Sequence, residues 1–333
     1  MREIGSEFWN VPIKDYVNNE CFDEMQWFLS GRSALQSIVG ELKECRTVGM
    51  PSWCCDCMIK PFIDAGIRVV FYPVIWEDGR LSVKINYDCD ILFIMDYFGY
   101  SQQSIDVSDF NGIIIRDESH SIFSRKYRDA DYYFGSLRKW CGVWTGGYAK
   151  TRDEHILEAK ATDNTRYVAL RERAMALKRE YMENNSSSKD YLEVYYEAEK
   201  LLDNIGMLCA DERDIKVAKK LDVAMIIKKH RENAEILREA FYDWLVFPEM
   251  QTTDCPMFVP VIIPDGKRDD LRLYLNKNNV YCPVHWSISN YHSLSIAERF
   301  IYDNELSLVC DQRYGKNDMM RIVDCIKHFF LEL

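Results

Sequence analysis

The chain has 333 residues and a net charge of −11, and 47% of its residues are hydrophobic. This composition supports a sizeable core, in two domains or one large α/β unit, and excludes a disordered chain. The excess of acidic residues argues against nucleic-acid binding, which needs a basic surface. It still allows a local basic pocket for a small anion.

The twelve cysteines are scattered, apart from a cluster at Cys54, Cys55 and Cys57. Because the N-terminus shows no signal-peptide pattern and no apolar run could span a membrane, we expect reduced thiols and a cytoplasmic protein. A zinc site needs a second Cys or His pair at a spacing typical of such sites, and none follows the cluster. We therefore expect no metal.

Between residues 30 and 150, short apolar runs alternate with helical segments. The pattern predicts helices over 33–42 and 56–65 and strands over 47–50, 68–72, 90–96 and 112–117. The last two runs are typical of central parallel strands that are buried on both faces. This alternation predicts a doubly wound, mostly parallel sheet, in which ligands bind at the carboxyl ends of the strands.

The remainder of the chain is first helical and then mixed. We expect helices over 167–182, 191–202 and 218–242, strands over 258–263, 280–284 and 305–310, and further helices over 269–278 and 316–330. The predicted division is a large domain over 1–240, which includes the N-terminal segment and the helical part 152–240, and a small C-terminal α+β domain over 241–333.

A first candidate binding segment is Ser30-Gly31-Arg32-Ser33, at the start of the first predicted helix. Free backbone N–H groups and the helix dipole at such a turn suit a phosphate. An ordinary helix cap is the alternative interpretation.

A second candidate group follows the strand over 112–117. Asp117 ends that strand and His120 follows three residues later. An Asp at the carboxyl end of a buried strand is well placed to face a ligand. A helix N-cap for Asp117, and a hydrogen-bonded core histidine for His120, are the alternatives.

A third candidate segment contains Ser136 and Lys139, followed by the pair Gly146-Gly147. A lysine among aromatic and apolar neighbours suits imine formation with a carbonyl group. A surface lysine in a basic turn is the alternative.

Together, these segments occur in the order and spacing of one known arrangement. The sequence resembles fold-type I pyridoxal 5'-phosphate (PLP) enzymes, and among them the DegT/DnrJ/EryC1/StrS sugar aminotransferase-like family. The resemblance rests on SGRSALQSIV, MPSWCCDCMIKPFIDAGIRVVFYPV, MDYFGY, IIIRDESHSIF and YYFGSLRKWCGVWTGGYA, with VYCPVHWSIS and LSLVCDQRYG near the C-terminus. The implied fold is an α/β PLP-transferase fold with a mostly parallel large domain.

The resemblance also implies residue roles. Lys139 corresponds to the lysine that forms an imine with PLP, Asp117 to the carboxylate that holds the pyridine nitrogen protonated, and His120 to the residue beside the phenolic oxygen. Gly31, Arg32 and Ser33 correspond to the phosphate turn, with Ser136 as a further phosphate ligand. Lys139, Asp117 and His120 are thus the implied catalytic residues, and the resemblance implies that they also bind the cofactor.

Two features mark a divergent branch. Only Leu137 and Arg138 separate Ser136 from Lys139, which is a shorter spacing than in better-known members. The family places an aromatic ring over the cofactor, for which Trp53 is the candidate, although the aligned position can instead be Cys55. His285 and Trp286 align with a segment near the active-site mouth, with a packed strand end as the alternative.

The implied function is an aminotransferase that acts on a keto group of a nucleotide-linked sugar in surface-polysaccharide biosynthesis, with a small amino donor such as glutamate. The presence of Lys139 argues against the dehydratase branch, which lacks this lysine. Another PLP reaction, such as a lyase or an amino-acid aminotransferase, and a non-catalytic homologue stay open as alternatives. A homodimer is implied, with no nucleic-acid or membrane partner. Arg32, Arg138 and Arg313 are candidates to bind a diphosphate, with structural ion pairing as the alternative.

Overall fold

A seven-stranded sheet lies at the centre of the large part of the computed structural model, which describes residues 3–85, 87–101, 105–124, 127–160, 164–184, 187–203 and 206–332. Its strand order is β2-β10-β9-β8-β7-β3-β4. The strands are β2 (Gln26–Phe28), β3 (Thr47–Pro51), β4 (Arg68–Tyr72), β7 (Ile91–Met95), β8 (Ile113–Asp117), β9 (Tyr132–Ser136) and β10 (Gly147–Thr151). Strand β10 is antiparallel to both of its neighbours, and the pairs from β9 to β4 are parallel. The predicted mostly parallel sheet is confirmed.

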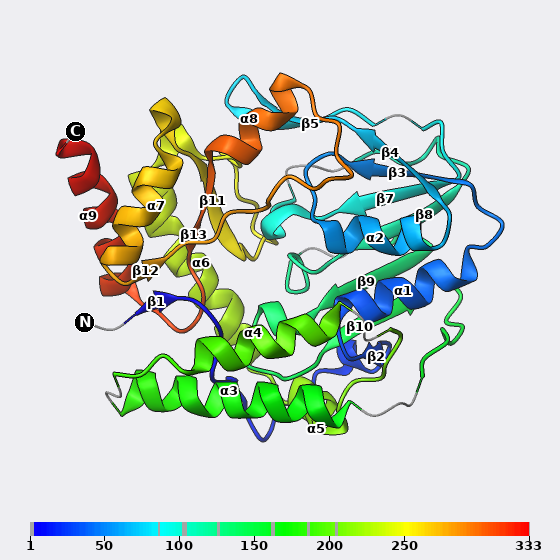
Figure 1. The fold of residues 1–333 in the computed structure, drawn as a ribbon, viewed down its shortest axis with the longest axis horizontal. Helices are drawn as coiled ribbons and strands as arrows, with labels where there is room; N and C mark the ends of the chain where they lie inside the picture. Colours follow the sequence, from blue (N-terminus) through cyan, green and yellow to red (C-terminus); the bar gives the residue numbers. More distant parts are fainter. Residues whose placement is uncertain are drawn as a thin grey trace.

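Helices α1 (Gly31–Glu41) and α2 (Asp56–Asp64) pack together on one face of this sheet, where α1 contacts β9 and β10 and α2 contacts β4 (Figure 1). All five residues of β7 are buried, as expected for a central strand that is covered on both faces. A hairpin of β5 (Val74–Glu77) and β6 (Arg80–Val83) follows β4.

The helical part contains α3 (Thr165–Glu183), α4 (Tyr191–Leu202), α5 (Glu212–Lys219) and α6 (Val223–Ala240). Helices α3 and α4 pack side by side along one edge of the molecule (Figure 1). The single helix predicted over 218–242 is wrong. The chain breaks between α5 and α6 because the Asp222 carboxylate accepts the Met225 N–H and caps a new helix.

The C-terminal part has its own hydrophobic core. Strands β11 (Phe258–Ile262) and β13 (Glu305–Val309) pair antiparallel, and α6, α7 (Arg268–Lys277) and α9 (Lys316–Leu331) pack around them. Strand β12 (Val280–Tyr281) pairs in parallel with β1 (Ile4–Gly5), so the N-terminal strand docks here. Helix α8 (Ile296–Asn304) lies against β5. The domain boundary at 241 stays a prediction.

None of the helices in the described ranges is long and apolar enough to span a membrane.

Candidate active site

The register of the sheet brings the predicted site segments to one edge. Asp117, the last residue of β8, pairs with Met95 of β7 and Phe134 of β9. Two residues further along β9, Ser136 pairs with Gly147 of β10, which also pairs with Phe28 at the end of β2. Helix α1 begins directly after β2. Asp117, Ser136 and the start of α1 therefore lie at the ligand-binding end of the sheet.

The start of α1 forms a cradle that suits an anion. The Ser30 hydroxyl accepts the Ser33 N–H at 3.1 Å, which leaves the amides of Gly31 and Arg32 without an acceptor inside the helix. A Cβ on Gly147 would lie 2.0 Å from the Ser30 carbonyl oxygen, so β10 approaches this turn as closely as it does only because residue 147 is a glycine. Gly31 in turn lies beside Ser136.

Asp117 is a buried carboxylate, 2% exposed. One of its oxygens accepts the Ser119 N–H at 2.8 Å, and the carboxylate has no ion-pair partner within the described ranges. Burial raises the pKa of Asp117, against the lowering effect of the Lys139 charge and the Ser119 hydrogen bonds. Its ionised form would therefore be stabilised by a further cation bound at this position.

Lys139 follows β9 in the short helical turn Leu137–Lys139. Its Nζ lies 3.4 Å from Nε2 of His120. Burial lowers the pKa of His120 well below the usual value, and the charges of Lys139 and His285 add to this effect, so the imidazole is neutral. Nδ1 of His120 is buried without a hydrogen-bond partner among the described residues.

Trp53 takes part in aromatic packing. Its ring is fully buried and stacks on Tyr97 with a centroid distance of 4.9 Å, and its indole N–H donates to the carbonyl of His285. Cys55 is only partly buried and occupies the N-cap position of α2, where its side chain makes no capping hydrogen bond. A hydrogen bond with Cys57 and burial raise the pKa of Cys55, whereas the charge of Lys139 lowers it. Of the two candidates for the ring-facing position, Trp53 is fully buried in this packing, whereas Cys55 is partly exposed.

His285 and Trp286 reach the same region from the C-terminal part. The Trp286 ring stacks on His120 with a centroid distance of 5.7 Å, and the His285 ring lies 5.5 Å from that of His120. Nδ1 of His285 lies 2.9 Å from the Ser307 hydroxyl, and the backbone N–H of His285 donates to Glu305 at 2.9 Å. The sequence analysis missed Ser307 and Glu305, which fix the orientation of His285.

The three predicted phosphate-binding arginines are paired with carboxylates. The distances are 2.9 Å from Arg32 to Asp203, 2.6 Å from Arg138 to Glu199 and 2.7 Å from Arg313 to Asp311. These contacts favour the structural alternative for Arg138 and Arg313, which are largely buried. Arg32 is more exposed, as is Asp203, so the pair of Arg32 is the weakest of the three.

A cavity of about 390 Å³ contains Lys139 and lies between the N-terminal residues 5–8 and the C-terminal part. Arg272 and Asn276, one turn apart on α7, also line it. Arg272 has no carboxylate partner among the described residues, so it is a cation that is available to a ligand. The sequence analysis missed Arg272 because nothing in the local pattern of α7 distinguishes it from a surface residue.

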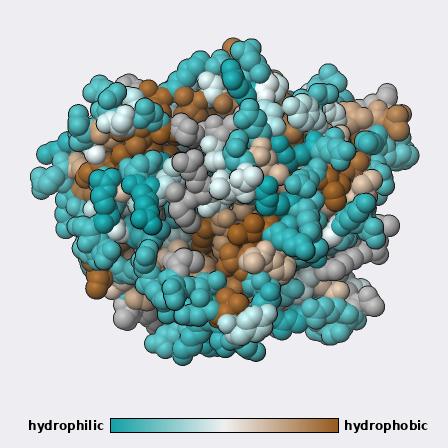
Figure 2. Space-filling model, turned by 180° about the vertical axis from the view of Figure 1, so that it is seen from behind, coloured by the Kyte–Doolittle hydropathy of each residue, from teal (hydrophilic) through white to brown (hydrophobic). Residues whose placement is uncertain are grey.

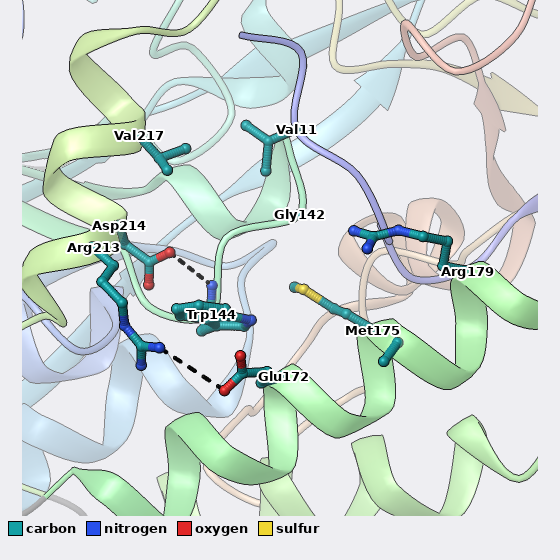
Figure 3. Close-up of a pocket in the computed structure, with 10 residues that line it drawn as sticks. Val11, Gly142, Trp144, Glu172, Met175, Arg179, Arg213, Asp214 and Val217 are labelled. Carbon is teal, nitrogen blue, oxygen red and sulfur yellow. Dashed lines mark hydrogen bonds and ion pairs between the residues drawn. The ribbon is translucent and has the colours of Figure 1, made fainter.

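A separate cavity of about 310 Å³ lies between α3, α5 and the N-terminal segment (Figure 3). The guanidinium carbon of Arg213 lies 4.2 Å from the centroid of the Trp144 ring, and the backbone N–H of Trp144 donates to the Asp214 carboxylate. Arg213 also forms a long ion pair with Glu172, with 4.0 Å between nitrogen and oxygen. None of the predicted site residues lines this cavity.

No protein-family model and no curated protein sequence matches the chain. Solved structures do. PseC of Helicobacter pylori, an aminotransferase involved in the biosynthesis of pseudoaminic acid, aligns with a TM-score of 0.66 at 15% identity, over 98% of this chain and 100% of its own. The sugar aminotransferase CalS13 of Micromonospora echinospora aligns with a TM-score of 0.58 at 14% identity, over 92% and 87%. NtdA of Bacillus subtilis, solved with bound cofactor PMP, aligns with a TM-score of 0.59 at 12% identity, over 91% and 72%. The chain has the fold of these proteins, and the fold predicted from the resemblance is confirmed.

Proposed function

We propose that the protein is a PLP-dependent aminotransferase that acts on a keto-sugar. One observation carries this proposal. Asp117, a buried carboxylate without an ion-pair partner among the residues that the structure describes, lies at the same sheet edge as Lys139 and the amides at the start of α1. The fold shared with PseC and CalS13 supports it.

The residues of the site fit pyridoxal phosphate. The amides of Gly31 and Arg32, with the hydroxyls of Ser33 and Ser136, would hold the phosphate, because a helix start favours a bound anion. Asp117 would balance the charge of the protonated pyridine nitrogen. Nδ1 of His120, which has no partner among the described residues, would donate a hydrogen bond to the ring oxygen. We propose Cys55, in place of Trp53, as the residue beneath the ring.

When bound, the cofactor supplies an electron sink for a carbanion formed on the substrate. The chain's own residues supply the other functions. Lys139 would be the nucleophile that holds the cofactor covalently, and its free amine would move a proton at the substrate carbon. Neutral His120 keeps a hydrogen-bond acceptor 3.4 Å from the Lys139 amine. The rings of Trp286 and Phe98 beside His120 exclude water from this side of the site.

The test of this proposal is spectroscopic. Purified protein with PLP should be yellow, glutamate should shift the absorption band, and a nucleotide-linked keto-sugar should restore it. Protein that stays colourless with PLP would contradict the proposal. Restoration by many unrelated 2-oxo acids, with no response to keto-sugars, would instead indicate an amino-acid aminotransferase. The cytoplasmic location and a role in polysaccharide biosynthesis stay predictions.

We infer that Arg272 binds the anionic group of a substrate in the Lys139 cavity. A charged hydrogen bond is worth about 1.5–3 kcal/mol, so Arg272→Ala should raise the substrate concentration for half-maximal response about 10- to 100-fold. Titrations with glutamate and with the nucleotide keto-sugar show which substrate depends on it. Lys277→Ala, an exposed residue on the same helix, is the matched control and should change neither titration. Unchanged titrations in Arg272→Ala would exclude this role.

We also propose a homodimer, as the resemblance implies. On the side of the molecule opposite to that in Figure 1, apolar side chains gather near the centre of the surface inside a mostly hydrophilic rim (Figure 2). Apolar surface of this kind is typical of protein interfaces. Light scattering at micromolar concentration should give twice the 39.3 kDa mass of one chain. Active, PLP-loaded protein that scatters only as a monomer would refute the dimer.

A further inference from the structure

Two cysteine sulfurs meet at the start of α2. Cys55 is the N-cap of this helix, Cys57 lies two residues later, and their Sγ atoms are 2.6 Å apart. Both residues are partly exposed. Their neighbour Cys54 is fully buried, and its Sγ lies 3.7 Å from Nε2 of His292. Because the sulfurs of a disulfide are about 2.05 Å apart, only a small movement separates Cys55 and Cys57 from bonding distance.

We propose that Cys55 and Cys57 are a modification site, at which a low-molecular-weight disulfide closes them into an internal disulfide at the start of α2. This inference goes beyond the proposed function and does not require the chain to bind PLP. It rests on the contact between the two sulfurs, their exposure, and the charged residues around them.

The surroundings of the pair activate one of the two sulfurs. The hydrogen bond from Cys55 and the charges of Arg32 and Lys139 lower the pKa of Cys57 to about 6, although burial and Asp117 oppose this. The same hydrogen bond raises the pKa of Cys55 well above its usual value. At neutral pH the pair therefore holds one thiolate and one thiol. The thiolate is the reactive form in disulfide exchange.

With glutathione disulfide as the oxidant, the chemistry balances in two steps. The Cys57 thiolate attacks one sulfur of glutathione disulfide, the disulfide bond of the reagent breaks, and one glutathione thiolate leaves. Cys55 then loses its proton to solvent and attacks Sγ of Cys57, which expels the second glutathione thiolate. The two protein thiols are oxidised to one disulfide, and glutathione disulfide is reduced to two glutathione molecules.

The experiment treats the reduced, full-length protein with glutathione disulfide near neutral pH and removes the reagent. The protein is then unfolded in guanidinium chloride so that buried thiols also react, the remaining thiols are blocked with iodoacetamide, and the tryptic peptides are analysed. Because trypsin does not cleave the Lys60–Pro61 bond, the relevant peptide runs from Thr47 to Arg68, and it contains all three clustered cysteines and no other cysteine. We expect it to lose two hydrogens and to carry the alkyl group on Cys54 alone. Dithiothreitol should restore three alkylated cysteines. Three alkylated cysteines after oxidation, or a stable glutathione adduct on the wild-type peptide, would overturn the proposal.

Serine variants assign the bond. Cys54→Ser, the matched control in the same peptide, should still close. Cys55→Ser should stop at a glutathione adduct on Cys57, and Cys57→Ser should remain unmodified. Closure in either of the last two variants would mean that another pair reacts.

Added PLP tests the location of the pair independently. In protein that has taken up PLP, we expect closure to slow by about tenfold or more, because the cofactor would cover the exposed thiols. An unchanged closure rate in loaded protein would show that the pair lies away from the bound cofactor. A chain that takes up no PLP contradicts the proposed function, whereas the peptide result still decides the disulfide.

Discussion

Lys139→Ala is expected to abolish the borohydride-sensitive absorption band completely and to leave a folded protein. The lysine follows β9 on a short turn, and its amine contacts only His120 among the side chains described. Its removal therefore breaks no ion pair that the structure shows. Among the described residues, no other lysine lines the cavity between the N-terminal residues and the C-terminal part. Absorption spectra before and after borohydride, recorded with added PLP, measure the effect.

Two further variants separate charge from covalent chemistry. Lys139→Arg keeps a positive charge near Asp117 but cannot form the covalent link, so it should also lose the band. Lys60→Ala, an exposed residue of α2 that pairs with Asp64, should keep it. A reducible band that survives in Lys139→Ala would assign the covalent attachment to another lysine and remove the basis of the proposed mechanism.

The sequence predicts the strands from β8 to β4 well and those from β2 to β9, on the other side of the sheet, poorly. Strands β7 and β8 are short, continuous apolar runs, which is the pattern of a strand buried on both faces. Strands β9 and β10 were not predicted, because each contains a glycine where a neighbouring group approaches closely. Gly135 lies against the Tyr148 ring, and Gly147 lies against Ser30. Those close approaches exist only in the assembled sheet.

The β5–β6 hairpin was not predicted, although its turn has a recognisable sequence pattern. The β5–β6 hairpin turns at Asp78-Gly79, and both residues have positive φ angles. An Asp-Gly pair between two short runs is a strong hairpin pattern, so this element could have been predicted from the sequence alone.

In the site, the sequence predicts the residues that share a motif and misses the partners that come from distant segments. Asp117, His120 and Lys139 lie together as their motifs imply. The carboxylates that pair with Arg32 and Arg138 lie on or just after α4, more than 60 residues from either arginine along the chain, where no pattern in the sequence points to them. The contact between Cys55 and Cys57 joins two residues that are close in the sequence, yet the sequence does not predict it. The sequence places both residues at a helix start, and the structure shows that Cys55 has an extended backbone there and that the two sulfurs are in contact.

Asp117→Asn is expected to lower the rate of amino transfer by roughly a thousandfold while PLP still binds. The amide keeps the shape of the side chain and can still accept the Ser119 N–H through its carbonyl oxygen. It cannot balance a positive charge on the ring nitrogen. Two opposite charges about 4 Å apart at an effective dielectric near 20 interact by about 4 kcal/mol, which corresponds to about three orders of magnitude in rate. Single-turnover kinetics with glutamate measure this change directly.

Asp96 provides the matched control for this experiment. It follows the neighbouring strand β7 and its side chain is 9% exposed, but its carboxylate pairs with Arg116 at 2.6 Å. Asp96→Asn breaks a buried ion pair, so it should lower the melting temperature and leave the single-turnover rate of the folded fraction unchanged. Asp117→Asn should instead leave the melting temperature nearly unchanged and lower the rate, because no ion pair among the described residues is broken. If Asp117→Asn instead retains the wild-type rate with an intact absorption band, another group must balance the ring nitrogen. The buried Asp117 carboxylate would then need a role other than balancing the charge of the ring nitrogen.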